Sequence, residues 1–259
     1  ENRFCLYAQQ IAPLKPQPGQ AGHIEILLRL HDESGRMILP DSFIPAAERY
    51  GLMTQLDRWV VENVFKVIAQ CIEQEHELPL AMCAINLSGI TIGDDAFLHF
   101  LREQFVNYAI PPEMICFEIT ETSAIANLGS AIRFINELKG LGCHFSLDDF
   151  CAGMSSFAYL KHLPVDFLKI DGSFVKDMLD DPINRAMVEV INHIGHVMGK
   201  QTIAEFVETN QIEQALLEIG VDYAQGYVIE RPQLFTCDSL QSRPARPQPL
   251  LFKAPGTFR

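Results

Sequence analysis

Eight apolar segments rich in β-forming residues recur along the chain, and most are separated by amphipathic stretches. We expect strands near residues 3–9, 23–30, 80–87, 113–120, 143–148, 165–170, 201–206 and 221–225. Helical periodicity fits residues 54–76, 94–107, 127–140, 182–199 and 209–219, with Asn127 and Thr209 as expected N-caps. Strands that alternate with helices are typical of a parallel sheet covered by helices. The pattern therefore predicts an α/β fold, a TIM-type (β/α)8 barrel.

The connection between the first two expected strands departs from this alternation. Residues 10–22 read QIAPLKPQPGQAG, with three prolines and two glycines. A parallel connection usually needs a dozen or more residues, most of them helical. We therefore expect a modified barrel in which the first strand is antiparallel to the second. The barrel domain is expected over residues 1–232, and a loosely ordered tail over 233–259, where proline and polar residues are frequent.

Charge and cysteine usage exclude several classes of function. The formal net charge of −13 repels polyanions, so we expect no nucleic-acid polymer as a partner. No apolar run approaches the ~20 residues of a membrane span, so no membrane contact is expected from this segment. The seven cysteines show no C-x-x-C spacing, which favours reduced, buried thiols and a cytoplasmic location over a disulfide or zinc framework.

Polar side chains gather in seven expected strands, most of them at the carboxyl ends. They are Glu25, Arg29, Asn86, Glu118, Glu121, Asp148, Asp149, Lys169, Asp171, Glu205, Glu208 and Gln225. In a barrel the carboxyl ends of the parallel strands meet on one face, where active sites lie. Such a cluster is hard to explain as surface decoration.

The charge of this cluster favours bound metal. Glu25, Glu118, Asp148, Asp149 and Glu205 carry five negative charges, and carboxylates this close repel each other unless cations neutralise them. An all-oxygen ligand set is preferred by Mg²⁺ or Mn²⁺ rather than zinc. The histidines do not join the pattern. Two such metals suit in-line displacement at phosphorus, so phosphodiester hydrolysis is the chemistry that fits.

Nine motifs, in order, resemble the EAL domain family, which hydrolyses the bacterial second messenger cyclic di-GMP. They read EILLRL (25–30), FIPAAERYG (43–51), LDRWV (56–60), INLSG (85–89), FEITET (117–122), LDDF (147–150), LPVDFLKIDGSFV (163–175), IAEFVET (203–209) and DYAQGY (222–227). The resemblance covers residues 3–232 and implies a barrel with an antiparallel first strand. The implied reaction opens one phosphodiester of cyclic di-GMP and releases linear pGpG, with two Mg²⁺ or Mn²⁺ ions per site.

The resemblance also implies roles for individual residues. The implied ligands of one metal are Glu25, Asn86, Glu118 and Asp148. Those of the second are Asp149 and Glu205, with Asp148 bridging. Lys169 matches the lysine that holds the hydrolytic water, and Asp171 and Gln225 match residues that support the second metal and its water. Gln9, Leu28, Arg29 and Asp171 are implied substrate contacts, with Arg29 on a phosphate. Glu121 and Glu208 match residues behind the ligands, and Glu121 would anchor the loop after the fifth strand.

The chain departs from the family at three places. The family usually has glycine where Cys151 and Phe206 stand, and threonine where Ala152 stands. It usually has Tyr-Gln-Pro where this chain has Ala8-Gln9-Gln10. Cys151 must keep an ordinary backbone conformation or carry strain of ~1–3 kcal/mol. The changes at Cys151 and Ala152 bear on regulation and turnover more than on metal ligands.

Two functions stay open from the sequence. The first is a phosphodiesterase, because every matched metal and water-positioning residue is present. The second is a catalytically weak or inactive cyclic di-GMP receptor that signals through dimer or partner contacts. A purely structural module would leave the carboxylates unexplained. The resemblance further implies a homodimer and an upstream GGDEF or sensor domain.

Overall fold

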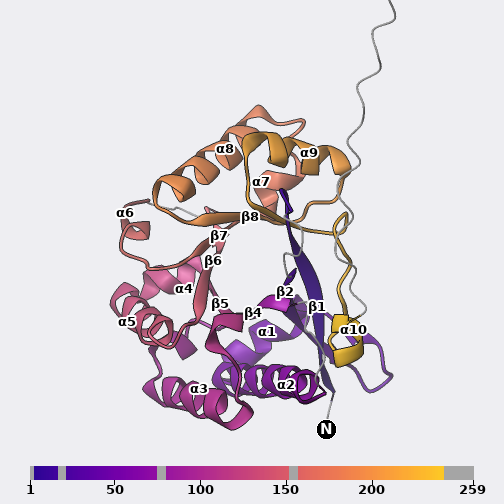
Figure 1. The fold of residues 1–259 in the computed structure, drawn as a ribbon, viewed down its shortest axis with the longest axis vertical. Coiled ribbons are helices and arrows are strands. Elements are labelled where there is room, and N and C mark those ends of the chain that lie inside the picture. Colours follow the sequence, from indigo (N-terminus) through magenta and orange to yellow (C-terminus); the bar gives the residue numbers. More distant parts are fainter. Residues whose placement is uncertain (1–2, 17–21, 75–79, 152–156, 242–259) are drawn as a thin grey trace, which may run out of the picture.

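Eight strands close a barrel in the structure, a computed structural model that describes residues 3–16, 22–74, 80–151 and 157–241 (Figure 1). The barrel strands are β1 (Phe4–Pro13), β2 (Gly22–His31), β4 (Leu80–Asn86), β5 (Ile115–Thr120), β6 (His144–Phe150), β7 (Phe167–Ile170), β8 (Gln201–Ala204) and β9 (Tyr223–Gln225). Their order is β1-β9-β8-β7-β6-β5-β4-β2, and pairing of β1 with β2 completes the circle. The predicted barrel is confirmed.

The first strand runs antiparallel to both of its barrel neighbours. Gln9 of β1 pairs with Glu25 of β2, and Ile11 pairs with Gln225 of β9. The other neighbouring barrel strands pair in parallel. The prediction drawn from the short connection is therefore confirmed, although β1 extends four residues beyond its expected end at residue 9, to Pro13.

Five long helices lie close to their predicted positions. They are α2 (Met53–Glu73), α3 (Asp95–Tyr108), α5 (Leu128–Lys139), α8 (Pro182–Val197) and α9 (Asn210–Ile219). Asn127 and Thr209 cap α5 and α9 by accepting hydrogen bonds from the backbone N–H groups of Ser130 and Ile212. These helices lie above, below and to the left of the strands in Figure 1 and bury their apolar faces against them.

The shorter elements were not predicted from the sequence. They are α1 (Pro40–Arg49), α4 (Glu121–Ala126), α6 (Phe157–Leu160), α7 (Gly172–Lys176), the two-residue strand β3 (Met37–Ile38) and two 3₁₀ turns at Thr91–Gly93 and Pro112–Met114. Helix α1 is short, contains Pro45 in its interior and has no fully buried residue; a proline inside a helical pattern argues against a helix there. None of the described helices is long and apolar enough to cross a bilayer.

Residues 233–241 do not form the loosely ordered tail that we expected. Strand β10 (Gln233–Leu234) pairs with β1, and helix α10 (Cys237–Gln241) packs beside α2. Cys71 of α2 and Cys237 form a disulfide, so the prediction of reduced thiols is wrong for this pair. The Cα atoms are 5.4 Å apart because β10 returns the chain to the barrel wall. Residues 242–259 lie outside the described part of the chain.

Helix α3 ends at a strained residue. Ala109, at its C-cap, has φ of 49° in the left-handed region, and its side chain is exposed. A left-handed residue other than glycine costs roughly 1–2 kcal/mol, and glycine removes that strain at the expense of a more flexible unfolded chain.

We therefore expect Ala109→Gly to raise the free energy of unfolding by about 0.5–1 kcal/mol, measured by urea denaturation. Ala96→Gly is the control, because Ala96 is exposed in the first turn of the same helix. This control should lose about 0.5–1 kcal/mol. Equal signs for the two variants would contradict the assignment of strain to Ala109.

A layer of apolar and aromatic side chains closes the lower end of the barrel interior. It comprises Ile11, Met82, Ala84, Cys116, Phe167, Ile203 and Tyr223, which form a cluster separate from the core beneath the helices. The ring of His23 stacks on Tyr223 with centroids 5.0 Å apart. Burial, and next the charge of His144, lowers the pKa of His23 to about 4. The lower interior is thus mainly apolar, with His23 packed against it, whereas the carboxylates gather at the upper end of the barrel.

The partly buried His23 makes stability depend on pH. Its folded pKa of about 4 lies below the ordinary value of 6.5, so the unfolded chain binds more protons between these values. His23 therefore costs the fold nothing above pH 6.5, and the fold loses up to about 2–3 kcal/mol as pH falls toward 4.

Urea unfolding of the wild type, His23→Leu and His162→Gln at pH 7 and pH 4.5 tests this expectation. His23→Leu should lose less stability on acidification than the wild type. The exposed control His162→Gln should follow the wild type. The same pH dependence in His23→Leu and the wild type would count against a partly buried, neutral His23.

Candidate active site

The ammonium group of Lys169, near the end of β7, lies at the centre of four carboxylates. Its Nζ atom is 2.8 Å from Glu118 Oε2, 3.0 Å from Glu205 Oε1, 3.1 Å from Asp148 Oδ1 and 3.3 Å from Glu25 Oε2. The Lys169 side chain is only 1% exposed. Carboxyl groups from β2, β5 and β6, and from the residue after β8, thus converge as the barrel geometry predicts.

Amide side chains complete the polar contacts of Glu25. Asn86 Nδ2 donates to Glu25 Oε1 at 2.7 Å, and Gln225 Nε2 donates to Glu25 Oε2 at 2.6 Å. Gln225 Nε2 also lies 3.2 Å from Gln9 Oε1. Burial raises the pKa of Glu25, but the charge of Lys169 and these hydrogen bonds outweigh burial, so the pKa is lowered overall. Glu25 is therefore held as a carboxylate.

The other carboxylates of this group are less well compensated. Burial raises the pKa of Glu205 to about 8, because the charge of Lys169 offsets that burial only in part. Burial likewise raises the pKa of Glu118, and the charges of Glu25 and Asp148 add to it. These four carboxylates raise the pKa of Lys169 despite its burial. The site thus holds more negative charge than one ammonium group neutralises.

Two observations indicate that these residues fit divalent cations. Oxygens of Asp148, Asp149 and Glu205 lie within 4.8 Å of one another, the spacing of groups that share an ion. Glu118 Oε1 is buried and has no hydrogen-bond partner among the described residues. Burial and the charges of Asp148 and Asp171 raise the pKa of Asp149 to about 6. An all-oxygen donor set with surplus negative charge suits Mg²⁺ or Mn²⁺.

A cavity of about 490 Å³ opens above the carboxylates. Its lining includes Gln9, Glu25, Leu27, Arg29, Leu39, Pro40, Asp41, Asp148, Glu205, Phe206, Glu208, Gln225, Gly226, Tyr227 and Pro232. The guanidinium of Arg29 donates to the backbone carbonyl of Leu28 at 2.8 Å. The cavity therefore brings the expected Gln9, Arg29 and Glu208 together with the carboxylates.

Leu28 requires a correction. Side chains alternate along β2, so Glu25, Leu27 and Arg29 face the cavity, while Leu28 packs against the core beneath the helices. Leu27 lines the cavity where we expected Leu28. The rim residues Leu39, Pro40 and Asp41 were missed, because they belong to the unpredicted α1 and the residue before it. Tyr227 was also missed as a site residue, although it belongs to the quoted motif DYAQGY.

Phe206 stands at the cavity mouth in a conformation that favours glycine, with φ of 52°. A Cβ atom on Gly172 would lie 2.2 Å from the Phe206 ring, so only glycine leaves room for that ring. Lys176 Nζ lies 4.2 Å from the ring centroid. Half of the Phe206 surface is exposed. An aromatic ring thus occupies a place where the family usually has no side chain.

Two further expected residues, Glu121 and Asp171, do not line the cavity. Glu121 Oε2 accepts from the backbone N–H of Cys151 at 2.9 Å, and its other oxygen accepts from the Tyr159 hydroxyl. Asp171 caps α7 by accepting from the N–H of Ser173. Cys151 has φ of 69°, so of the two conformations expected for it the strained one is found. Ala152 lies outside the described residues.

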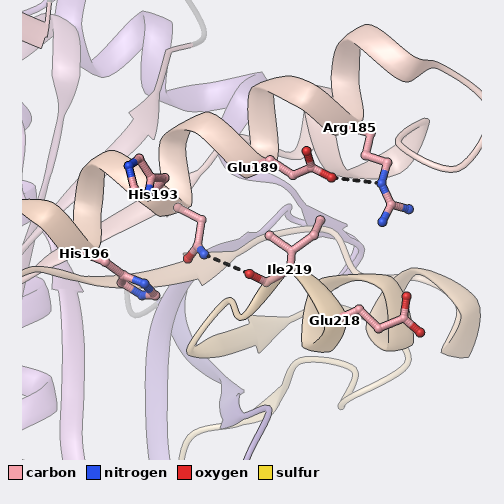
Figure 2. Close-up of a pocket in the computed structure, with 7 residues that line it drawn as sticks. Arg185, Glu189, His193, His196, Glu218 and Ile219 are labelled. Atoms are coloured by element: carbon pink, nitrogen blue, oxygen red, sulfur yellow. Dashed lines mark hydrogen bonds and ion pairs between the residues drawn. The ribbon is translucent and has the colours of Figure 1, made fainter.

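A second, polar groove lies between α8 and α9 and encloses about 360 Å³ (Figure 2). It includes His193 and His196, but His196 Nε2 lies 2.8 Å from Asp222 Oδ2. In the part of the chain that the structure describes, the one group of three or more potential ligands close enough for a metal is Asp148, Asp149 and Glu205. This groove therefore does not compete with the barrel mouth as a metal site.

Comparisons with known proteins agree with this geometry. The EAL domain profile matches residues 1–232. The chain is 39% identical to cyclic di-GMP phosphodiesterase PdeB of Shewanella oneidensis over 95% of this chain and 28% of the relative. It is 36% identical to cyclic di-GMP phosphodiesterase PdeF of Escherichia coli over 90% of this chain and 30% of the relative. The chain thus spans less than a third of the length of these relatives.

The comparison with solved structures also finds EAL domains. The crystal structure of the FimX EAL domain from Pseudomonas aeruginosa bound to c-di-GMP superposes with a TM-score of 0.81 and 32% identity. This match covers 90% of the present chain and 91% of the FimX chain. With the profile match, the antiparallel first strand and the carboxylates at the barrel mouth, these findings show that the chain belongs to the EAL domain family.

Proposed function

We propose that this domain is a phosphodiesterase that hydrolyses cyclic di-GMP to linear pGpG with Mg²⁺ or Mn²⁺. The observation that carries the proposal is the complete set of carboxylates around Lys169 beneath an open cavity of about 490 Å³. The curated relatives PdeB and PdeF are named as phosphodiesterases of this substrate, and FimX binds it.

The carboxylates would divide between two cations. Glu25, Asn86, Glu118 and Asp148 would hold one ion, and Asp149 and Glu205 the other, with Asp148 shared between them. When bound, the two ions activate water and stabilise the leaving oxygen of an in-line displacement. Glu118 Oε1, which is buried without a partner among the described residues, would gain one. Asp171 would support Asp149, and Gln225 would orient Glu25 through the 2.6 Å hydrogen bond.

Lys169 would change partners during the reaction. Once its carboxylate neighbours hold cations, its Nζ atom can hydrogen-bond the water that attacks phosphorus. The water oxygen would form the new P–O bond while the bond to the 3′ oxygen breaks. One proton of the water would end on the 3′ oxygen, and the other would stay on the new 5′ phosphate or pass to solvent. Arg29 would hold a phosphate, because its guanidinium faces the cavity and recognises phosphate oxygens in a planar, bidentate way.

Aromatic rings at the cavity mouth would accept the bases. Phe206 and Tyr227 line the cavity, and each is about half exposed. Lys176 and Arg231 lie over their rings, at 4.2 and 4.5 Å from the centroids. A planar guanine and its phosphate suit a mouth that offers both aromatic surface and positive charge.

The deciding experiment incubates the domain with cyclic di-GMP and Mg²⁺ or Mn²⁺ and measures pGpG by chromatography. We expect pGpG to form, and to stop forming when EDTA removes the metal. Binding of cyclic di-GMP without any product would contradict the enzyme and support the receptor function instead.

The assembly and surroundings of the domain are also proposals. We propose a homodimer, and α8 offers a surface for it, because Ile183, Val190 and Val197 are exposed at heptad spacing. Analytical ultracentrifugation measures this, and a monomer at micromolar concentration would contradict it. We also propose an upstream GGDEF or sensor domain, in keeping with relatives more than three times longer than the matched region. We propose a cytoplasmic location as well, in keeping with the five cysteines that the structure holds as thiols. Sequencing of the complete gene and cell fractionation test these two points.

A further inference from the structure

Asp57 is a buried carboxylate in the motif LDRWV, to which the proposed reaction assigns no role. It lies in the second turn of α2 and is 5% exposed. Its Oδ2 atom accepts from the backbone N–H of Ser88 at 3.1 Å and from the Ser88 hydroxyl at 2.6 Å. The hydroxyl of Thr91 donates to the same oxygen. One carboxylate oxygen therefore binds three donors of the loop that follows β4.

Burying the Asp57 carboxylate costs free energy, and holding the loop in place is the gain that would offset this cost. Among the described residues Asp57 forms no ion pair with a lysine or arginine, so three hydrogen bonds alone compensate its charge. Burial raises the pKa of Asp57, although the hydrogen bonds from Ser88 and Thr91 oppose that rise. A neutral or apolar side chain would pack into this position at lower electrostatic cost. Its contacts with the loop are the one specific gain that the structure offers.

The loop carries an expected metal ligand. Asn86, the last residue of β4, stands two positions before Ser88, and its amide donates to Glu25 Oε1 at 2.7 Å. Between them, the backbone N–H of Leu87 donates to the carbonyl of Glu118 at 2.9 Å. Fixing Ser88 therefore fixes the exit of β4 against β5, and with it the direction of the Asn86 side chain.

Gly89 allows the same loop to pack directly against helix α4. A Cβ atom at Gly89 would lie 2.7 Å from Ser123 Oγ, so the loop backbone packs directly on α4. Ser123 is in turn bonded to Thr120, whose hydroxyl donates to it at 2.7 Å. The loop thus lies between α2 and α4, and Asp57 makes the loop's hydrogen bonds to α2.

We infer that Asp57 is a positioning residue that acts through Ser88 and Thr91 to hold Asn86 in its metal-binding geometry. The inference rests on the proposed function, because it concerns the same metal site. Asp57 itself touches neither the cavity lining nor the carboxylates around Lys169. Its effect on metal affinity should therefore pass through Asn86 and leave residues across the barrel, such as Glu205, unaffected.

The first measurement uses the metal-free protein. Asp57→Asn keeps the size of the side chain but removes its charge. Hydrogen exchange followed by mass spectrometry should show residues 86–91 exchanging at least about 10-fold faster than in the wild type. Glu62→Gln is the control, because Glu62 is exposed on the same helix and should exchange like the wild type. Unchanged exchange over residues 86–91 in Asp57→Asn would overturn the inference.

The second measurement is the affinity for Mn²⁺, determined by calorimetric titration. Asp57→Asn should raise the Mn²⁺ dissociation constant about 10-fold, as expected when a residue behind a ligand is changed. In an Asn86→Ala background the same substitution should raise the Mn²⁺ dissociation constant by less than about a further 2-fold, because Asn86, through which Asp57 acts on the metal, is absent. In a Glu205→Gln background it should keep its full effect. An equal effect in both backgrounds would overturn the inference.

An Asp57→Asn variant that does not fold and a wild-type protein that binds no Mn²⁺ would have different consequences. If Asp57→Asn does not fold, Ser88→Ala removes one of the same hydrogen bonds and should show both changes at about 3-fold. A wild-type protein that binds no Mn²⁺ would contradict the proposed metal site, whereas the hydrogen-exchange result in the metal-free protein would still decide the role of Asp57.

Discussion

Replacing Glu25 with alanine should lower the rate of cyclic di-GMP hydrolysis by more than about 100-fold. Glu25 contacts Lys169, Asn86 and Gln225, and no other carboxylate of the site makes contacts to both amide side chains. The substitution removes a proposed metal ligand and also leaves the amides of Asn86 and Gln225 without their acceptor. Both the affinity for metal and the orientation of neighbouring groups should therefore suffer.

The measurement is the rate of pGpG formation at saturating Mn²⁺ and cyclic di-GMP. Glu189→Ala is a matched control, because Glu189 is an exposed carboxylate on α8. The control should keep wild-type turnover. Wild-type turnover in Glu25→Ala would show that the carboxylates around Lys169 are not the reaction site.

Replacing Lys169 with methionine should destabilise the metal-free protein strongly. Lys169 is the buried cation among Glu25, Glu118, Asp148 and Glu205, and removal of one partner from a buried ion network costs about 3–5 kcal/mol. For a domain of this size that loss lowers the melting temperature by roughly 6–20 °C. Mn²⁺ should restore part of the loss, because it supplies the positive charge that the variant lacks.

Thermal melting of the wild type, Lys169→Met and Lys66→Met, with EDTA or with Mn²⁺, tests this expectation. Lys66 is exposed on α2, so its variant controls for the loss of a lysine elsewhere. The Mn²⁺-dependent rise in melting temperature should be larger for Lys169→Met than for the wild type. An unchanged melting temperature in EDTA would mean that protons, rather than Lys169, neutralise these carboxylates in the metal-free state.

Local patterns in the sequence sufficed to predict the barrel and the convergence of carboxylates at one of its ends. Strand periodicity located Glu118 and Asp148 at neighbouring strand ends, and the barrel geometry then required their side chains to converge. The antiparallel β1 followed from a connection too short and too rich in proline for a crossover. These features depend on residues close in sequence or on a rule that applies to every barrel.

Features that depend on contacts between distant residues were not predicted. Cys71 and Cys237 are 166 residues apart, and no spacing signal joins them. Leu28 was assigned to the cavity instead of Leu27, because a shift of one residue along a strand turns the side chain to the other face. The place of the Phe206 ring depends on the space that Gly172 leaves for it, which only the folded chain reveals.

The position of β1 has a consequence for the synthesis of this domain. Its barrel neighbours are β2, which follows at once, and β9, which contains Tyr223–Gln225. A nascent chain therefore cannot close the barrel until Gln225 has left the ribosome. Until then the edges of β1 and β8 expose unpaired backbone groups, and such open edges invite pairing with other chains. We expect chaperone binding during translation to last until β9 emerges.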